Sequence, residues 1–423
     1  MLTNTRQTPD LDPPVRRIAV ISVHGCPMVV PGMRAAGGMN VSLRNIAPLL
    51  ADAGVCVDVF TRSHHLGGPQ AVEMSLRSRT IHIPAGDPGL TRGETYPHLP
   101  EFQEGLLRFL EEESLTYDLV HSHYWLSGEI GRSVADRLAV PHFTSFHTIA
   151  AVKERASDEP EPPQRHAAEG RIARSADGIF ALTEGERQDI GDLLGADTER
   201  VRVVPGGVDL ERFAPRDRTQ ARDRLGLSHH EKIVLFVGRP EPFKGPDVLV
   251  RALAYLREPS HVRLLLVGGS EIEHSVDWIY DIANQAGMRD RVQWQPAIPQ
   301  ADLPDFYAAA DVCAVPSHHE SFGLAALEAM ACGRPVLAST VAGLESLIDD
   351  GRTGSLVGTH DPMDFARSLE ELLNNPLRRE RMGEAAHQAA ATYTWEAAAS
   401  RTLDGYAAVL RDAVGRAAVA PCP

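Results

Sequence analysis

Two successive series of short apolar runs, with room for a helix between most of them, constrain the fold of this 423-residue chain more than any other feature. The first series begins at residues 17–23 and the second at residues 232–238. Runs of this length without a helical period indicate buried strands. Strands that alternate with helices form parallel sheets covered on both faces. The sequence therefore predicts an α/β fold with two Rossmann-like, doubly wound domains.

Each expected element has a definite place in the chain. Strands are expected at residues 17–23, 55–60, 80–83, 118–122, 141–145, 178–182, 201–205, 232–238, 262–267, 292–296, 312–315, 335–338 and 355–357. Helices are expected after residues 36–40 as far as 53, and at 102–113, 129–139, 246–256, 277–286, 303–310 and 322–331.

The expected domain boundaries follow from these elements. Residues 1–15 are rich in Thr, Pro and Asp and lack the apolar core of a signal peptide, so we expect a disordered tail. Residues 16–208 form the first expected domain and residues 209–394 the second, with a glycine pair before the boundary as a candidate hinge. Residues 395–414 are expected to form a terminal helix.

Composition narrows the range of partners. A net charge of −15 argues against a general nucleic-acid-binding protein, because a polyanion would be repelled. No apolar run reaches the ~18 residues that a membrane span requires, so we expect no membrane insertion. The five cysteines contain no Cys-x-x-Cys pair, which predicts buried thiols in a reducing cytoplasm and no zinc site. Small molecules are the expected partners, and a homodimer is left open.

The segment 317–333 carries the strongest chemical signal. It follows an apolar run and contains two carboxylates, Glu320 and Glu328, on either side of the expected start of a helix. Backbone N–H groups at a helix N-terminus bind anions, and carboxylates accept hydrogen bonds from vicinal hydroxyls. A diphosphate joined to a sugar satisfies both. The backbone donors expected here belong to Ser321, Phe322, Gly323 and Leu324.

A second loop, residues 238–245, follows the strand that opens the second series. It contains Arg239 and Lys244, which can converge on one diphosphate from the carboxyl end of a strand. Glycines Gly37 and Gly38 lie between the first strand and its helix, a geometry that brings backbone amides close to a phosphate. A glycine pair alone is a weak signal, since most such pairs only turn the chain.

Further polar residues follow other strands. His147 comes directly after the strand 141–145 and fits a general base, a hydrogen-bond partner of sugar hydroxyls or a packed histidine. His121 is interpreted as structural, while His123, beside the aromatic pair Tyr124 and Trp125, is left undecided.

The pattern Glu320-Ser-Phe-Gly-Leu-(x)3-Glu328 resembles the signature of the retaining family 4 glycosyltransferases of GT-B fold. The resemblance implies two Rossmann-like domains facing a central cleft, with the nucleotide sugar mainly on the second domain and the acceptor on the first. It also implies that the terminal helix packs back on the first domain. Members need no metal and hold no tightly bound cofactor, so the nucleotide sugar is a co-substrate and Arg239 and Lys244 neutralise its diphosphate.

Motifs spread over residues 17–412 are similar to those of the subfamily that glycosylates inositol 3-phosphate in mycothiol synthesis. They include the segments 36–40, 121–128, 147–153, 160–165 and 205–209. The resemblance implies that UDP-N-acetylglucosamine is the donor. Residues matched to the donor site are Arg239, Lys244, Glu320 and Glu328, with His147 near the hexose; those matched to the acceptor site are Asn40, Tyr124, Thr148 and Arg165.

Two departures from the subfamily concern the acceptor phosphate. Tyr96 stands where a phosphate-binding lysine is expected, and Arg34 stands near the glycines where an acidic residue is usual. Arg165 lies in a Pro-rich segment that is expected to be a loop. If the acceptor carries a phosphate, Arg165 becomes its main charge partner, with Arg34 as a second cation.

Three alternatives stay open at this point. A natural-product glycosyltransferase of the same ancestry would use a UDP- or GDP-sugar and a small thiol, aminocyclitol or sugar as acceptor. Synthesis of a sucrose-phosphate type is the second alternative. A sugar-nucleotide-binding protein without activity is the third, although both cations and both glutamates favour an enzyme. The sequence does not separate a UDP donor from a GDP donor.

Overall fold

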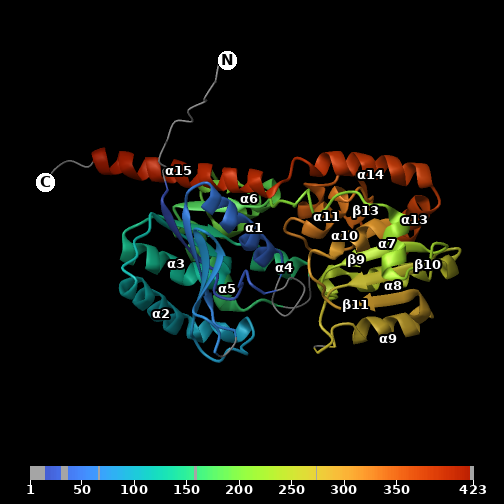
Figure 1. The fold of residues 1–423 in the computed structure, drawn as a ribbon, viewed down its shortest axis with the longest axis horizontal. Coiled ribbons are helices and arrows are strands. Elements are labelled where there is room, and N and C mark those ends of the chain that lie inside the picture. Colours follow the sequence, from blue (N-terminus) through green and yellow to red (C-terminus); the bar gives the residue numbers. More distant parts are fainter. Residues whose placement is uncertain (1–14, 30–36, 65–66, 157–159, 273, 420–423) are drawn as a thin grey trace, which may run out of the picture.

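The computed structural model describes residues 15–29, 37–64, 67–156, 160–272 and 274–419, with side chains as far as residue 411. The chain forms two α/β lobes side by side (Figure 1). The long helix α15 (Trp395–Val419) follows the second lobe in the sequence and lies along the first (Figure 1). The expected disordered tail, apart from residue 15, and Arg34 lie outside the described residues.

Within the described residues, the first lobe contains an eight-stranded sheet in the order β3-β4-β2-β1-β5-β6-β7-β8. All its neighbouring strands are parallel except β3 and β4. Side chains of α1 and α15 pack with one face of the sheet, and side chains of α2, α3, α5 and α6 pack with the other. The elements are β1 (Arg17–Ile21), α1 (Gly38–Asp52), β2 (Cys56–Arg62), β3 (Ala71–Ser75), β4 (Ser78–Ile83), α2 (Leu99–Glu112), β5 (Leu119–His123), α3 (Tyr124–Leu138), β6 (His142–Ser145), α4 (Ala150–Arg155), α5 (Pro163–Ser175), β7 (Gly178–Ala181), α6 (Glu184–Leu194) and β8 (Val201–Val203).

The second lobe contains a parallel sheet in the order β11-β10-β9-β12-β13-β14 within the described part of the chain. Residues of α7, α10, α11 and α14 form one apolar core with it, and residues of α8, α9 and α13 form the other. The elements are α7 (Arg218–Leu225), β9 (Lys232–Val237), α8 (Pro246–Leu253), β10 (Val262–Val267), α9 (Asp277–Gln285), β11 (Val292–Gln295), α10 (Leu303–Ala309), β12 (Val312–Val315), α11 (Leu324–Ala331), β13 (Val336–Ser339), α12 (Ala342–Glu345), β14 (Gly354–Val357), α13 (Pro362–Leu373) and α14 (Pro376–Ala390).

The two chain passages between the lobes run beside each other. The Val208 amide donates a hydrogen bond to the Tyr393 carbonyl at 2.9 Å, and Val208 forms a parallel bridge with Thr394. A Cβ atom on Gly207 would lie 2.4 Å from the backbone nitrogen of Trp395, so only glycine fits at this crossing. Because the two strands of this connection are hydrogen-bonded, the lobes are joined by a paired segment and not by one loose linker.

The predicted fold class is confirmed. The expected strands 262–267 and 312–315 match β10 and β12, and most others are displaced by one or two residues. Strand β3 was not predicted, because it is a partly exposed edge strand that pairs antiparallel and has no buried apolar run. The terminal helix extends five residues beyond the expected 414. We propose that the domain boundary lies between β8 and α7, close to residue 208.

Candidate active site

A cavity of about 1050 Å³ lies between the two lobes. Loops after β1, β6, β9 and β12 contribute to its wall, so it opens at the carboxyl ends of strands from both sheets. In doubly wound folds this edge is the usual position of ligands. The cavity is lined by most of the residues selected from the sequence: Gly37, Gly38, Asn40, Tyr124, His147, Thr148, Arg239, Lys244, Glu320, Ser321, Phe322, Gly323, Leu324 and Glu328.

Glu320 forms the centre of a charged group on the wall of the second lobe. One of its carboxylate oxygens accepts hydrogen bonds from Lys244 Nζ at 2.6 Å and from Ser317 Oγ at 3.2 Å. A Cβ atom on Gly343 would lie 2.1 Å from the Glu320 carbonyl oxygen, so this backbone is held against a glycine. The side chains of Glu320 and Lys244 are 17% and 25% exposed, which leaves both accessible to a ligand.

The helix after this loop starts later than the sequence predicts. It begins at Leu324 and not at about Phe322, because Gly323 caps it with φ of +101°, a left-handed conformation that favours glycine. Phe322 is 4% exposed and packs near Gly206, while it also reaches the cavity wall. The Ser321 hydroxyl donates a short hydrogen bond to the His147 carbonyl, which links the two lobes across the cavity.

Arg239 and Lys244 both line the cavity, as two cations for one diphosphate require. Arg239 forms an ion pair with Glu241, with 2.5 Å between guanidinium nitrogen and carboxylate oxygen. Lys244 ends a short 3-10 helix, Pro242–Lys244, and Gly245 follows with φ of +67°. A Cβ atom on Gly245 would lie 2.2 Å from the carbonyl oxygen of Pro316, so this glycine packs the two cavity loops together.

Glu328 lies deeper than its position in the sequence suggests. Its side chain accepts hydrogen bonds from the Tyr307 hydroxyl at 2.7 Å and from Gln300 Nε2 at 3.0 Å. Burial raises the pKa of this carboxyl to about 7, although both hydrogen bonds favour the charged form. The side chain is therefore held in one orientation at the cavity wall.

His147 combines an unusual backbone with a buried ring. Its φ is +60°, and its Nε2 forms a 2.8 Å hydrogen bond with Nδ1 of His123. Burial lowers the pKa of His147 to about 4, so the ring is neutral at physiological pH. A neutral imidazole donates through one ring nitrogen and accepts through the other. His123, left undecided by the sequence, therefore orients His147, while His121 binds Tyr406 and Ser145.

Gly38 and Asn40 bring the first helix up to the cavity. A Cβ atom on Gly38 would lie 3.4 Å from a methyl group of Leu324, so the first lobe closely approaches the start of α11 here. Asn40 is 3% exposed; its amide donates to the Cys26 carbonyl at 2.8 Å and its oxygen accepts from the Gly37 amide at 3.1 Å. Asn40 thus holds the loop as well as lining the cavity.

The expected loop around Arg165 is wrong. Arg165 lies in the first turns of α5, because Pro163 occupies the start of the helix, where a missing N–H costs no hydrogen bond. Its side chain is 1% exposed and forms ion pairs with Glu161 at 2.8 Å and Glu169 at 2.7 Å. It also donates to the Thr148 hydroxyl at 3.0 Å. Arg165 does not line the cavity itself; it holds Thr148, which does.

Tyr124 lines the cavity, and its ring lies near two arginines. The Arg165 guanidinium lies 4.9 Å from the ring centroid and that of Arg92 lies 5.7 Å away. Tyr96 takes another direction: its ring stacks on Trp125 at 5.3 Å and its hydroxyl donates to Glu129 at 3.4 Å. It is absent from the cavity wall formed by the described residues.

Arg92 is the residue that the sequence analysis missed. It lines the cavity beside Tyr124, and among the described residues its guanidinium has no carboxylate partner. Only four positions separate it from Tyr96, so a search for any basic residue in this loop would have found it. A second missed residue is His24, whose ring lies 4.6 Å from that of Tyr124. Burial lowers the pKa of His24 well below its usual value.

Each of the two lobes matches a known family model. Residues 217–389 match the model described as glycosyl transferases group 1, and residues 37–207 match the glycosyl transferase 4-like domain. The chain is 42% identical to a D-inositol 3-phosphate glycosyltransferase of Xylanimonas cellulosilytica over 92% of this chain and 96% of that protein. It is 43% identical to a protein of the same name from Kineococcus radiotolerans, over 94% of this chain and 96% of that protein.

Solved structures agree on the fold. A sucrose-phosphate synthase from Thermosynechococcus elongatus aligns with a TM-score of 0.88 and 33% identity, covering 95% of this chain and all of that chain, 100%. The Anabaena protein HepE, solved in complex with UDP-glucose, aligns with a TM-score of 0.72 and 19% identity over 95% and 99%. Among the described residues, no helix is both long and apolar enough to cross a membrane.

Proposed function

Since this chain belongs to the group 1 glycosyl transferases and is a glycosyltransferase that uses a nucleotide sugar, we propose that it transfers N-acetylglucosamine from UDP-N-acetylglucosamine to D-inositol 3-phosphate. The observation that carries the proposal is the distribution of charge in the cavity. Two cations and two glutamates line the wall of the second lobe. On the first lobe the cavity is lined by Thr148 and by Arg92, which lies over Tyr124 and has no carboxylate partner among the described residues.

The donor half of the proposal rests on the second lobe. Arg239 and Lys244 would bind the diphosphate, with the backbone amides before α11 as further donors. Glu320 would accept hydrogen bonds from sugar hydroxyls, and the fixed carboxyl of Glu328 would bind the ribose. Because two cations already compensate the diphosphate charge, we propose that no metal ion is needed.

The acceptor half rests on the first lobe. Arg92 would bind the acceptor phosphate in place of the lysine expected at position 96, and Tyr124 and Thr148 would bind ring hydroxyls. A guanidinium without a carboxylate partner is suited to a phosphate, since it offers two parallel donors. Arg165 would act through Thr148, because its own charge is already compensated by Glu161 and Glu169.

The proposed reaction retains configuration through attack on the face from which the phosphate departs. The bond from the anomeric carbon to the β-phosphate oxygen breaks, the bond to the acceptor oxygen forms, and the departing phosphate accepts the acceptor proton. Lys244 and Arg239 would stabilise the negative charge that develops on the diphosphate. His147, neutral and held by His123, would donate to or accept from a hydroxyl of the transferred sugar.

A second candidate is transfer to a phosphorylated sugar. The similarity to a sucrose-phosphate synthase at 33% identity supports it, as does Arg92, which would bind any acceptor phosphate in this position. Both candidates place a phosphate in the same part of the cavity and differ in the ring that carries it.

Product formation from UDP-N-acetylglucosamine tests the main proposal. We expect a glycosylated inositol phosphate with inositol 3-phosphate as acceptor, and activity that excess EDTA does not abolish. In matched reactions, inositol or fructose 6-phosphate replaces the acceptor, or GDP-glucose replaces the donor. NMR of the anomeric proton of the product reports whether the configuration is retained. A product with fructose 6-phosphate alone would favour the second candidate. Loss of activity in EDTA with recovery on Mg²⁺ would contradict the metal-free site.

The variant Arg92→Ala tests the acceptor site. We expect the acceptor KM to rise by one to two orders of magnitude, because a charge-assisted hydrogen bond contributes roughly 1.5–3 kcal/mol. The donor KM should stay within about twofold, since Arg92 belongs to the first lobe and the loops that would bind the diphosphate belong to the second. The control is Arg171→Ala on α5, because Arg171 pairs with Glu129 outside the cavity. An unchanged acceptor KM in Arg92→Ala would exclude this phosphate site.

A further inference from the structure

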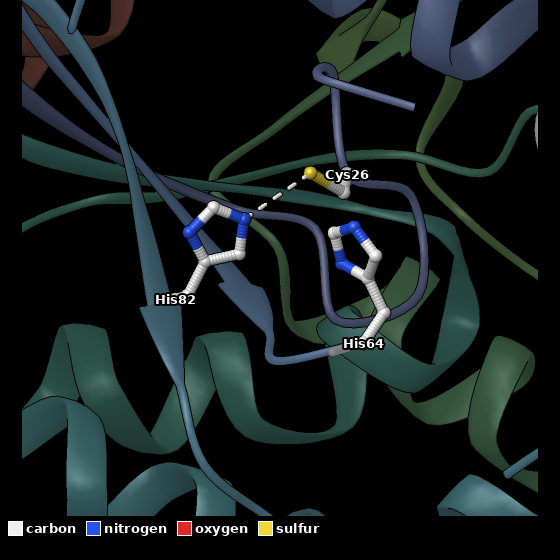
Figure 2. Close-up of side chains that lie close together, drawn as sticks. All are labelled: Cys26, His64 and His82. Carbon is white, nitrogen blue, oxygen red and sulfur yellow. Dashed lines mark hydrogen bonds between the residues drawn. The ribbon is translucent and has the colours of Figure 1, made fainter. Parts of the chain in front are cut away.

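Three potential metal ligands converge in the first lobe outside the cavity wall (Figure 2). Cys26 belongs to the loop after β1, His64 follows β2 and His82 lies in β4. Their ligand atoms, one sulfur and two ring nitrogens, all lie within 4.8 Å of one another. Because β1, β2 and β4 are neighbours in the sheet, the topology brings these residues together although they are distant in sequence.

The spacing of the ligand atoms suits a tetrahedral ion. Cys26 Sγ lies 3.5 Å from His82 Nε2. Zinc bonds of about 2.3 Å to sulfur and about 2.0–2.1 Å to nitrogen, at tetrahedral angles, also separate these two atoms by about 3.5 Å. The rings of His64 and His82 have centroids 5.5 Å apart, and the exposed His64 would supply the third ligand atom, which lies within 4.8 Å of the other two.

We propose that Cys26, His64 and His82 bind one Zn²⁺ ion, with a water molecule as the fourth ligand. A thiolate and two imidazoles are soft to borderline donors that select zinc over magnesium or calcium. Cys26 and His82 are buried and shield the ion, whereas His64 is exposed and leaves access from solvent. The sequence analysis expected no zinc site because it found no Cys-x-x-Cys pair, and the three ligands proposed here form no local motif.

The proposed ion would act on the loop that supports the cavity. The Cys26 carbonyl accepts the hydrogen bond from Asn40, and Asn40 holds Gly37 at the start of α1. Both residues line the cavity, whereas the three ligands do not. A bound ion would therefore fix this loop from the side away from the cavity, without contacting the substrates. This role is separate from the proposed transfer reaction.

Titration of the metal-free, untagged chain with Co²⁺ and then Zn²⁺ tests the site. We expect one Co²⁺ per chain, with a thiolate-to-metal charge-transfer band and the visible bands of a tetrahedral ion, both removed by one equivalent of Zn²⁺. Cys26→Ser should abolish the charge-transfer band, and His64→Asn should weaken the Co²⁺ affinity at least tenfold.

Two control variants separate this site from adventitious binding. Cys56→Ser replaces another free cysteine of the same lobe, and His230→Asn replaces an exposed histidine of the second lobe; both should bind Co²⁺ like the parent chain. Because His64 is exposed, His64→Asn should fold even if Cys26→Ser does not. Circular dichroism checks the folding of both variants. Absence of a tetrahedral spectrum in the parent chain, or an unchanged affinity in folded His64→Asn, would overturn the proposal.

Discussion

Replacing Lys244 with alanine is expected to lower kcat at least a hundredfold, which corresponds to about 2.7 kcal/mol of transition-state stabilisation. Lys244 lines the cavity with its ammonium group 2.6 Å from Glu320. If it compensates the departing diphosphate, its charge acts mainly in the transition state, and kcat should fall more than donor affinity. Steady-state kinetics with the folded variant measures the effect.

Two companion variants decide how the loss at position 244 arises. Lys232→Ala removes a partly exposed lysine that binds Asn374 outside the cavity, and it should leave kcat unchanged. The double variant Lys244→Ala/Glu320→Gln removes both partners of the ion pair. Recovery of kcat in the double variant would mean that Lys244 only compensates Glu320. A loss at least as large as in Lys244→Ala would support separate roles toward the diphosphate and the sugar.

Arg165→Ala is expected to lower the free energy of unfolding by about 3–5 kcal/mol, because it leaves two carboxylates without their buried partner. Glu169 is 1% exposed and Glu161 is 11% exposed, so water can replace the guanidinium only in part. Urea unfolding followed by circular dichroism measures the change. This expectation replaces the simpler view, drawn from the sequence, that Arg165 is mainly a ligand of the acceptor.

The matched control for Arg165 lies on the same helix. Arg171 in α5 also pairs with a glutamate, Glu129, but its side chain is 56% exposed. Arg171→Ala should cost less than about 1 kcal/mol, as exposed ion pairs usually do. If Arg165→Ala unfolded at the same urea concentration as the parent while its acceptor KM alone rose, Arg165 would be a substrate ligand and not a support for Thr148.

The sequence by itself determined most of the strands and the loops that carry the donor chemistry. Apolar runs bounded by turn residues locate strands, because a strand of a parallel sheet is buried on both faces and is therefore apolar along its whole length. Arg239, Lys244 and Glu320 lie in the loops that follow such strands, so their place at the cavity could be predicted from chain order alone. The edge strand β3 escaped because it is partly exposed and so lacks that pattern.

Only the tertiary structure decided which polar residues are buried and which line the cavity, because a local sequence pattern does not record contacts between distant residues. Arg165 and Arg92 are both arginines near the acceptor side, yet one is buried between two glutamates and the other lines the cavity without a carboxylate partner among the described residues. Only the packing of α5 against its neighbours separates these roles. The Cys26, His64 and His82 group likewise exists because β1, β2 and β4 are adjacent in the sheet. Strand order and side-chain burial depend on contacts between distant residues, which sequence periodicity does not encode.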